Sequence, residues 1–334
     1  MWRNAPARCD LSLCLDVEFV ATQWHGPVMV HNVAVSDRQE QSGAFRFRGF
    51  GPLYDEVRPT PPIELGELIA RYCGGTPRLV VDLGSGTGLS SRWAARWAIE
   101  VVGVEPSDDM RAIAESRAAS GVRYVAGLSH DTGLGSGAAD VVLAVQALHW
   151  MEPGPTLREV GRILRPGGVF AAIDCDWPPV VGDCLAEQAW DDCRSGIQAL
   201  ESLLAKDPGG DAERIPPPVP GHRPVAPSRA GSKEDRRLLG GVRSWSKSGH
   251  LERMLASGHF SWGREVAMLS TDEGDAARFV GLLQSQGDYQ GVRRRGVTDA
   301  ELGVDRLRRV ALERLGDRRR PWHFVYRTRL AFAR

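Results

Sequence analysis

The stretch Val80–Gly88, VVDLGSGTG, places a short hydrophobic run directly before an acid and three alternating glycines. A run of this kind is typical of a buried parallel strand. Glycine permits positive φ angles and a close approach of the backbone to a ligand. In an open α/β sheet the ligand lies where such a strand turns into the following helix. The stretch therefore predicts a ligand site at the end of the first core strand.

The same alternation of strand and helix extends on both sides of this stretch. Short apolar runs that predict strands cover residues 79–83, 101–104, 122–125, 141–145, 169–173, 260–269 and 323–332. Helical spacing of apolar residues covers 63–73, 89–97, 107–119, 155–164, 185–204, 250–256, 272–284 and 298–315. Near-continuous apolar strands separated by helices indicate a parallel sheet covered on both faces. We expect a doubly wound, mostly parallel, Rossmann-like α/β sheet with an antiparallel C-terminal edge and a helical cap insertion.

The composition of the 334 residues predicts a soluble globular protein, because 42% of them are hydrophobic. No apolar run is long enough to span a bilayer, and Asp10, Asp16 and Glu18 interrupt the N-terminal apolar residues, so we expect a cytoplasmic protein without a membrane partner. The six cysteines show no CxxC spacing and predict reduced packing thiols and no metal site. Only three of the 42 basic residues are lysine. An arginine bias this general indicates coding composition rather than a phosphate-binding surface, so no nucleic-acid partner is expected.

Two acids flank the glycines. Asp82 stands two residues before Gly84, and Glu105 ends the next apolar run. A carboxylate at this second position accepts both hydroxyls of a ribose in dinucleotide sites, so the ligand is expected to contain a nucleoside. A dinucleotide fingerprint would need a third glycine where Leu89 stands, and the spacing GxGxG therefore argues against a pyrophosphate.

Four motifs carry a resemblance to a known family: DLGSGTG (82–88), GVEPSDDM (103–110), DVVLAVQALHW (140–150) and RILRPGGVF (162–170). In this series the sequence resembles the class I S-adenosylmethionine-dependent methyltransferases, specifically the methyltransferase type 11 group, and is similar in style to trans-aconitate methyltransferase. The resemblance covers roughly residues 54–173, with a looser match in the C-terminal HFVYRTRL. It implies S-adenosyl-L-methionine as the cofactor and a small-molecule acceptor as the partner.

The resemblance assigns one end of the cofactor to the glycine-rich bend. The backbone around Gly84 and Gly86 would hold the methionine portion, and Asp82 would orient that end. Glu105 would bind the ribose hydroxyls.

The adenine would lie farther along the same edge of the sheet. Met110 would cover its face, and His130 or Asp131 would meet its amine, although relatives usually have proline where Gly135 stands. The full set of cofactor-binding candidates is Arg58, Asp82, Gly84, Ser85, Gly86, Gly88, Glu105, Pro106, Met110, His130, Asp131 and Gln146.

Methyl transfer from a sulfonium is an in-line displacement, for which a protein aligns the nucleophile, excludes water and removes a proton where required. His149 follows the fourth strand run and is a candidate base, with a substrate or cofactor contact and a structural role as alternatives. Tyr54 is a second catalytic candidate, and Arg58 is placed to meet the cofactor carboxylate; helix-entry packing is the alternative for both. Trp150 and Trp177 are expected to line the acceptor pocket, with core packing as the alternative for Trp177.

Four segments are expected along the chain. Residues 1–44 form an N-terminal extension of unclear structure, and residues 45–177 form the cofactor-binding methyltransferase core. Residues 178–258 form a helical cap with a proline-rich loop at 207–234, and residues 259–334 complete the core sheet.

Together these patterns predict a methyltransferase that transfers a methyl group to a small-molecule acceptor by in-line displacement. Two alternatives stay open: a non-catalytic protein that binds S-adenosylmethionine or S-adenosylhomocysteine, and a nicotinamide-dependent oxidoreductase. The motifs leave the acceptor, the methylated element and the oligomeric state open.

Overall fold

The computed structural model describes residues 49, 51–206, 236–239 and 242–334. The expected N-terminal extension and proline-rich loop lie outside the described residues. One seven-stranded sheet runs in the order β3-β2-β1-β4-β5-β9-β8. Its strands are β1 (Leu79–Leu83), β2 (Glu100–Val104), β3 (Val122–Val125), β4 (Ala139–Val145), β5 (Leu164–Cys175), β8 (Phe260–Gly274) and β9 (Arg320–Ala333). A separate hairpin pairs β6 (Arg236–Leu239) with β7 (Val242–Trp245).

The order of the strands places a crevice beside β1. β1 pairs in parallel with β2 on one side and with β4 on the other, so the chain reverses its direction of winding at β1. Ligands bind outside the carboxyl ends of the strands at such a point. β9 runs antiparallel to β5, and β8 runs antiparallel to β9, which confirms the expected antiparallel edge.

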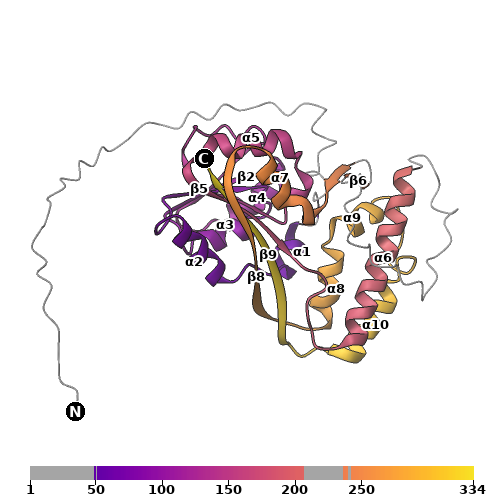
Figure 1. Ribbon diagram of the computed structural model, residues 1–334. Coiled ribbons are helices and arrows are strands. Elements are labelled where there is room, and N and C mark those ends of the chain that lie inside the picture. Colours follow the sequence, from indigo (N-terminus) through magenta and orange to yellow (C-terminus); the bar gives the residue numbers. More distant parts are fainter. Residues whose placement is uncertain (1–48, 50, 207–235, 240–241) are drawn as a thin grey trace, which may run out of the picture.

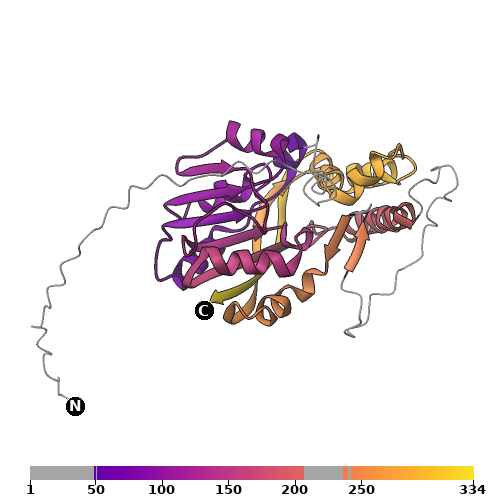
Figure 2. The ribbon, with the colours of Figure 1, turned by 90° about the horizontal axis from the view of Figure 1, so that it is seen from above.

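The helices cover both faces of this sheet (Figures 1 and 2). They are α1 (Gly51–Val57), α2 (Ile63–Tyr72), α3 (Leu89–Ala94), α4 (Asp108–Ser116), α5 (Pro153–Ile163), α6 (Cys184–Lys206), α7 (His250–Ala256), α8 (Ala276–Gln284), α9 (Gly287–Arg293) and α10 (Val304–Leu315), with 3-10 turns η3 (Leu148–Trp150) and η5 (Lys247–Gly249). Val80 of β1 packs with Trp93 of α3 on one face, whereas its neighbour Val81 packs with Leu157 of α5 on the other. Adjacent residues of a strand point to opposite faces, which is why these runs are apolar throughout.

A cap of four helices, α6, α8, α9 and α10, lies beside the sheet on the right of Figure 1. Trp190 of α6 and Leu307 of α10 belong to the same buried cluster as the α2 and α3 face of the sheet. Gln198 of α6 donates a hydrogen bond of 3.1 Å to Asp288 of α9. The expected cap segment therefore packs in space with helices that lie between β8 and β9 in the sequence.

Several boundaries differ from the expected ones. α1, α9 and the β6–β7 hairpin were not expected, because none of them shows a clear apolar period. The helix expected from Asp272 begins at Ala276, because β8 pairs with β9 as far as Gly274 and the side chain of Asp275 then accepts the amide proton of Arg278. In the described part of the chain, no helix combines the length and the hydrophobicity that a bilayer span needs.

Candidate active site

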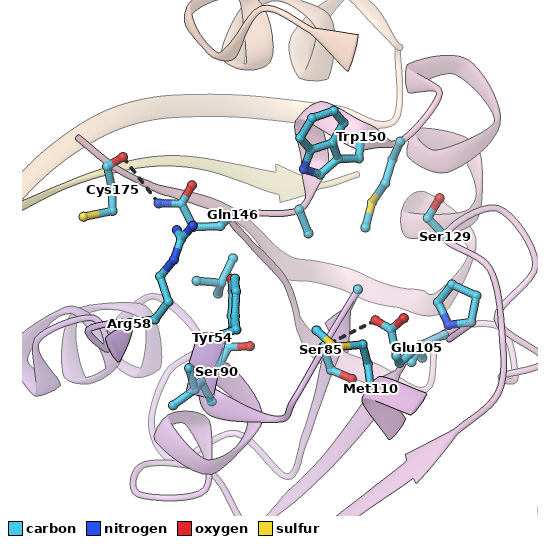
Figure 3. A pocket seen from close by; sticks show the side chains of 18 of the residues that line it. Tyr54, Arg58, Ser85, Ser90, Glu105, Met110, Ser129, Gln146, Trp150 and Cys175 are labelled. Atoms are coloured by element: carbon cyan, nitrogen blue, oxygen red, sulfur yellow. Dashed lines mark hydrogen bonds between the residues drawn. The ribbon is translucent and has the colours of Figure 1, made fainter. Parts of the chain in front are cut away.

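A cavity of about 440 Å³ opens at the carboxyl ends of the parallel strands (Figure 3). Its volume lies within the usual range for small-molecule sites. Glu105 and Met110 lie at one end of it, and Arg58 and Gln146 lie at the other. The expected site residues that line the cavity are Tyr54, Arg58, Gly84, Ser85, Gly86, Glu105, Pro106, Met110, His130, Gln146, Trp150 and Trp177. Those that do not line it are Asp82, Gly88, Asp131 and His149.

The glycine bend between β1 and α3 presents bare backbone to the cavity. Gly84 and Gly86 have φ angles of 66° and 55°, which other residues adopt only with strain. The amides of Gly84 and Ser85 donate to the carbonyl of Val104, and this ties the bend to the end of β2. The Ser85 hydroxyl is buried against Gly103 of β2 and has no hydrogen-bond partner among the described residues.

Gly88 serves packing rather than ligand contact. Its φ is 82°, and a Cβ there would lie 2.2 Å from the hydroxyl of Tyr124. Only glycine fits between the start of α3 and this side chain.

Glu105 is a buried carboxylate that the backbone holds in place. Oε2 accepts from the amide of Gly86 at 2.9 Å, and Oε1 accepts from the amide of Ser107 at 2.9 Å. Burial raises the pKa of Glu105 to about 7, and the two amides oppose part of that shift. Each carboxylate oxygen has a second lone pair, so the group can accept two further hydrogen bonds from a ligand in the cavity.

Asp82 lies behind the cavity wall instead of in it. Its Oδ2 accepts from the hydroxyls of Ser90 and Ser91 at 2.7 and 2.6 Å, and its Oδ1 is buried without a partner in the described chain. Burial raises the pKa of Asp82 to about 6, against the effect of the two hydroxyls. Ser90 does line the cavity, so Asp82 acts there through the serine.

Helix α1 closes one side of the cavity. Asp55 of α1 accepts from Arg92 of α3 at 2.7 Å and from Arg117 after α4, so two helices of the core hold α1 in place. α1 carries Tyr54 and leads into Arg58, both of which line the cavity.

Arg58 lies between two aromatic rings. Its guanidinium carbon is 4.8 Å from the ring centre of Tyr54 and 4.7 Å from that of Trp177. Nε and one terminal nitrogen donate to the hydroxyl and carbonyl of Ser285, both at 2.8 Å. Burial lowers the pKa of Arg58 from its ordinary value, although the group stays charged at neutral pH.

Gln146 has the only positive φ among the non-glycine residues that the structure describes, 54°. Its Oε1 accepts from Lys247 Nζ at 2.7 Å, and its Nε2 donates to the carbonyl of Cys175 at 3.3 Å. Backbone strain of this kind persists only where surrounding contacts enforce it, and it clusters at functional sites. Gln146 thereby links the ends of β4 and β5 to η5.

A second chamber of about 130 Å³ lies between the sheet and the cap. It shares Tyr54, Arg58, Gln146, Trp150 and Trp177 with the first cavity. Its other lining residues are His149, Arg194, Gln198, Ser244, Lys247, Gln286, Gly287 and Asp288. Sequence reasoning missed Arg194, Gln198, Lys247 and Asp288; the i, i+4 spacing of the first two on α6 was the one available signal.

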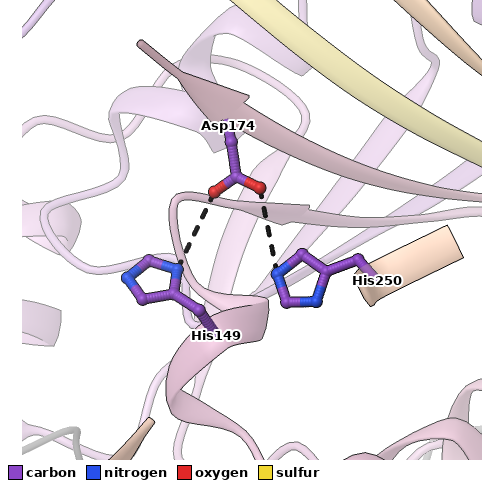
Figure 4. A group of neighbouring side chains, drawn as sticks. All are labelled: His149, Asp174 and His250. Atoms are coloured by element: carbon purple, nitrogen blue, oxygen red, sulfur yellow. Dashed lines mark ion pairs between the residues drawn. The ribbon is translucent and has the colours of Figure 1, made fainter. Parts of the chain in front are cut away.

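His149 faces this second chamber rather than the first. Its Nδ1 lies 3.8 Å from Asp174 Oδ1, which is longer than a hydrogen bond (Figure 4). Burial lowers the pKa of His149 well below its usual value, and the charges of Lys247 and Arg58 lower it further. The imidazole is therefore neutral at pH 7.

Asp174 is the centre of a buried group of charges. Arg329 and Lys247 each lie 3.0 Å from its oxygens, and His250 lies 3.9 Å away. His149, Asp174 and His250 are close enough together to bind a metal ion. However, Arg253 donates to His250 Nδ1 at 2.8 Å, which places the ring proton on Nε2, the atom that faces Asp174. The geometry is that of an ion-pair network, and these three side chains are poor ligands for a metal ion.

A family described as methyltransferase domain matches residues 81–172, which include the glycine bend and Glu105. Residues 81–172 are a methyltransferase domain. A structure from Anaeromyxobacter dehalogenans described as a type II methyltransferase shows the same fold, with a TM-score of 0.54 and 20% identity, over 83% of this chain and 97% of that one. The predicted Rossmann-like fold is thereby confirmed, and the family match agrees with the methyltransferase resemblance over residues 81–172.

Two curated relatives of the methyltransferase domain match over a shorter length. A probable S-adenosylmethionine-dependent methyltransferase of Saccharomyces cerevisiae is 32% identical over 124 residues, which are 35% of this chain and 43% of the yeast protein. An uncharacterized methyltransferase of Mycobacterium bovis is 35% identical over 116 residues, which are 34% of this chain and 46% of that protein. The matched segments thus span less than half of these relatives.

Proposed function

We propose that this chain transfers a methyl group from S-adenosyl-L-methionine to a small-molecule acceptor. The observation that carries the proposal is the buried Glu105 carboxylate, held by the amides of Gly86 and Ser107 at the wall of the larger cavity, within a methyltransferase domain. A carboxylate in this position at the end of the second strand is a known acceptor for ribose hydroxyls.

The residues of the cavity fit the cofactor. Glu105 has free lone pairs for the ribose, and the bare backbone of Gly84 and Gly86 leaves room for the polar methionine end. Pro106 and Met110 offer apolar surface to an adenine. When bound, S-adenosylmethionine supplies an electrophilic methyl group on a sulfonium.

Other residues of the chain position the acceptor and exclude water. Tyr54, Trp150 and Trp177 line both chambers, so their rings border the passage between them. The cap encloses the second chamber, whose small volume favours a small molecule over a macromolecule.

His149 is the candidate base of the second chamber. Its lowered pKa keeps the imidazole unprotonated at pH 7, and Nδ1 faces Asp174, an acceptor. With the ring proton on Nδ1, Nε2 is left with a lone pair that can take a proton from an oxygen or nitrogen nucleophile.

A cytoplasmic location and the absence of nucleic-acid partners stay predictions of the sequence.

Calorimetric titration with S-adenosylmethionine, S-adenosylhomocysteine and NAD separates the proposed cofactor from a nicotinamide. Release of S-adenosylhomocysteine with a panel of acceptors separates an enzyme from a binding protein. Preference for NAD, or cofactor binding without turnover on any acceptor, would overturn the proposal.

His149→Ala tests the base directly. We expect turnover to fall about 10²–10⁴-fold while the affinity for S-adenosylhomocysteine is retained. His323→Ala, on the exposed side of β9, is the matched control and should keep full turnover. Equal turnover in both variants would assign His149 a structural role.

A further inference from the structure

We propose that the second chamber is an oxyanion site, in which Arg194, Lys247 and Arg58 bind a carboxylate or phosphate group of the acceptor. The inference rests on the proposed function, because it names the class of molecule that the transferase would methylate. It assigns a role to the cap, which the family match does not cover.

The described lining of the second chamber carries an excess of positive charge. Three cations, Arg58, Arg194 and Lys247, face one carboxylate, Asp288. Asp288 is already engaged, since it accepts from Gln198 and lies 3.9 Å from Arg194 Nε. The side chains of Arg194 and Lys247 are 30% and 35% exposed, so they are open to a ligand, and an oxyanion would add counter-charge to this wall.

Arg194 has an unused donor in this wall. Its Nε is buried, and no hydrogen-bond partner for it exists in the described chain. The guanidinium carbon lies 5.6 Å from the ring centre of Trp190, one helical turn away on α6, so a cation–π contact restricts its position. A guanidinium edge with a free donor matches the geometry of a carboxylate or phosphate.

Arg58 offers a second unused donor group. Two of its three nitrogens bind Ser285, and the remaining terminal nitrogen has no hydrogen-bond partner among the described residues. The rings of Tyr54 and Trp177 both lie within cation–π distance of the guanidinium and border it beside the chamber. No carboxylate within the described ranges forms an ion pair with Arg58.

Lys247 completes the set. Its ammonium contacts Gln146 Oε1 at 2.7 Å and Asp174 Oδ1 at 3.0 Å, which leaves one of three protons for a ligand. Asp174 also pairs with Arg329 at 3.0 Å, and Arg329 in turn pairs with Glu265 at 2.8 Å, so Lys247 shares Asp174 with a second cation. The same positive field appears at His149: after burial, the charges of Lys247, Arg58 and Arg194 contribute to its lowered pKa.

The arrangement sets the orientation of the acceptor. An oxyanion on Arg194 and Lys247 would lie on the cap side, and the nucleophile of the acceptor would lie between His149 and the passage beside Gln146 and Trp177, facing the methyl donor in the larger cavity. The favoured acceptors are small organic acids or phosphate monoesters that carry a separate nucleophile.

The test uses the full-length protein with two probes, inorganic phosphate and citrate, titrated at constant ionic strength in the presence of S-adenosylhomocysteine. We expect Arg194→Gln to weaken probe binding at least tenfold and Arg194→Lys to retain part of it, with S-adenosylhomocysteine affinity unchanged. Arg96→Gln, on the exposed surface after α3, is the control and should bind as the wild type does. Thermal unfolding of each variant checks that it is folded.

A screen of acceptors then identifies the kind of oxyanion. Carboxylic acids and phosphate monoesters are each compared with their uncharged amides or alcohols, and only the charged member of a pair should release S-adenosylhomocysteine. Binding of S-adenosylhomocysteine without any probe binding, or equal probe binding in Arg194→Gln and wild type, overturns the oxyanion site. Probe binding that depends on Arg194 without any binding of S-adenosylhomocysteine overturns the proposed function instead and leaves the oxyanion site standing.

Discussion

Replacing Glu105 by glutamine tests the cofactor site with the smallest change of shape. Each oxygen of the carboxylate accepts one backbone amide, from Gly86 or from Ser107, at 2.9 Å. A glutamine amide has one oxygen, so its nitrogen must face one of these N–H groups. A buried N–H without a partner costs about 1–3 kcal/mol, which lowers the free energy of unfolding. Above pH 7 this loss is offset, because the neutral amide also removes the cost of burying a carboxylate whose folded pKa is about 7.

The same substitution weakens the ligand contact. A hydrogen bond to a charged acceptor contributes about 1.5–3 kcal/mol, which corresponds to about 10–100-fold in Kd. Because burial raises the pKa of Glu105 to about 7, wild-type affinity should rise as pH increases through that value and the carboxylate ionises. Below that pKa the affinity should fall by up to about tenfold per pH unit. Glu105→Gln has no group to ionise and should lack this dependence.

Calorimetric titration with S-adenosylhomocysteine between about pH 5.5 and 8.5, on either side of this pKa, measures both effects. The matched control is Glu115→Gln, at the exposed end of α4, whose side chain is 57% exposed. It should leave the affinity and the pH profile unchanged. If Glu105→Gln is folded and binds with the wild-type affinity and pH profile, the ribose does not lie on Glu105, and the placement of the cofactor is wrong.

Three further predictions concern stability. Gly88→Ala should lower the free energy of unfolding by about 2–4 kcal/mol, because a Cβ would meet the Tyr124 hydroxyl. Gly133 also has a positive φ but open space around it, so Gly133→Ala should lower the free energy of unfolding by only about 1 kcal/mol. Denaturant titration of the two variants measures this difference. Asp82→Asn should be more stabilising at pH 8 than at pH 5, by about 1.4 kcal/mol, because a folded pKa of about 6 makes the wild type lose stability as pH rises from about 4 to 6, and about half of that loss has occurred by pH 5; equal effects at both pH values would contradict this. His250 has a folded pKa of about 4, so as pH falls the unfolded chain binds a proton at this residue before the folded chain does. The wild-type free energy of unfolding should therefore fall as pH drops from about 6.5 to 4. Denaturant titration at several pH values should show a smaller loss of stability in His250→Gln.

The central sheet was largely predictable because its signals are local. The expected run at 122–125 is β3, and the expected helix at 250–256 is α7, with the same bounds. Each has apolar residues at the right period between breakers. The helix α1 was missed for the opposite reason, since its seven residues, Gly51–Val57, lack an apolar period, and Asp55 is held by arginines that lie far away in the sequence.

The candidate site was predictable in part. The glycine bend and Glu105 were found because a strand end, a glycine turn and an acid follow one another along a short stretch of chain. Asp82 lies behind the wall because both of its neighbours in β1 are also buried and its side chain turns to the α3 serines. Nothing in the local sequence shows which way that carboxylate points.

By itself, the sequence determined the parallel sheet and the position of its crevice, because apolar periodicity and backbone-permissive glycines act over a few residues. The methyltransferase assignment came from the resemblance of four motifs to a known family. Only the tertiary structure decided which charges share the second chamber. Arg58, Arg194 and Lys247 come from three distant segments, and each borders that space because helices pack on one sheet face. Long-range packing sets such distances, and no spacing along the chain encodes them.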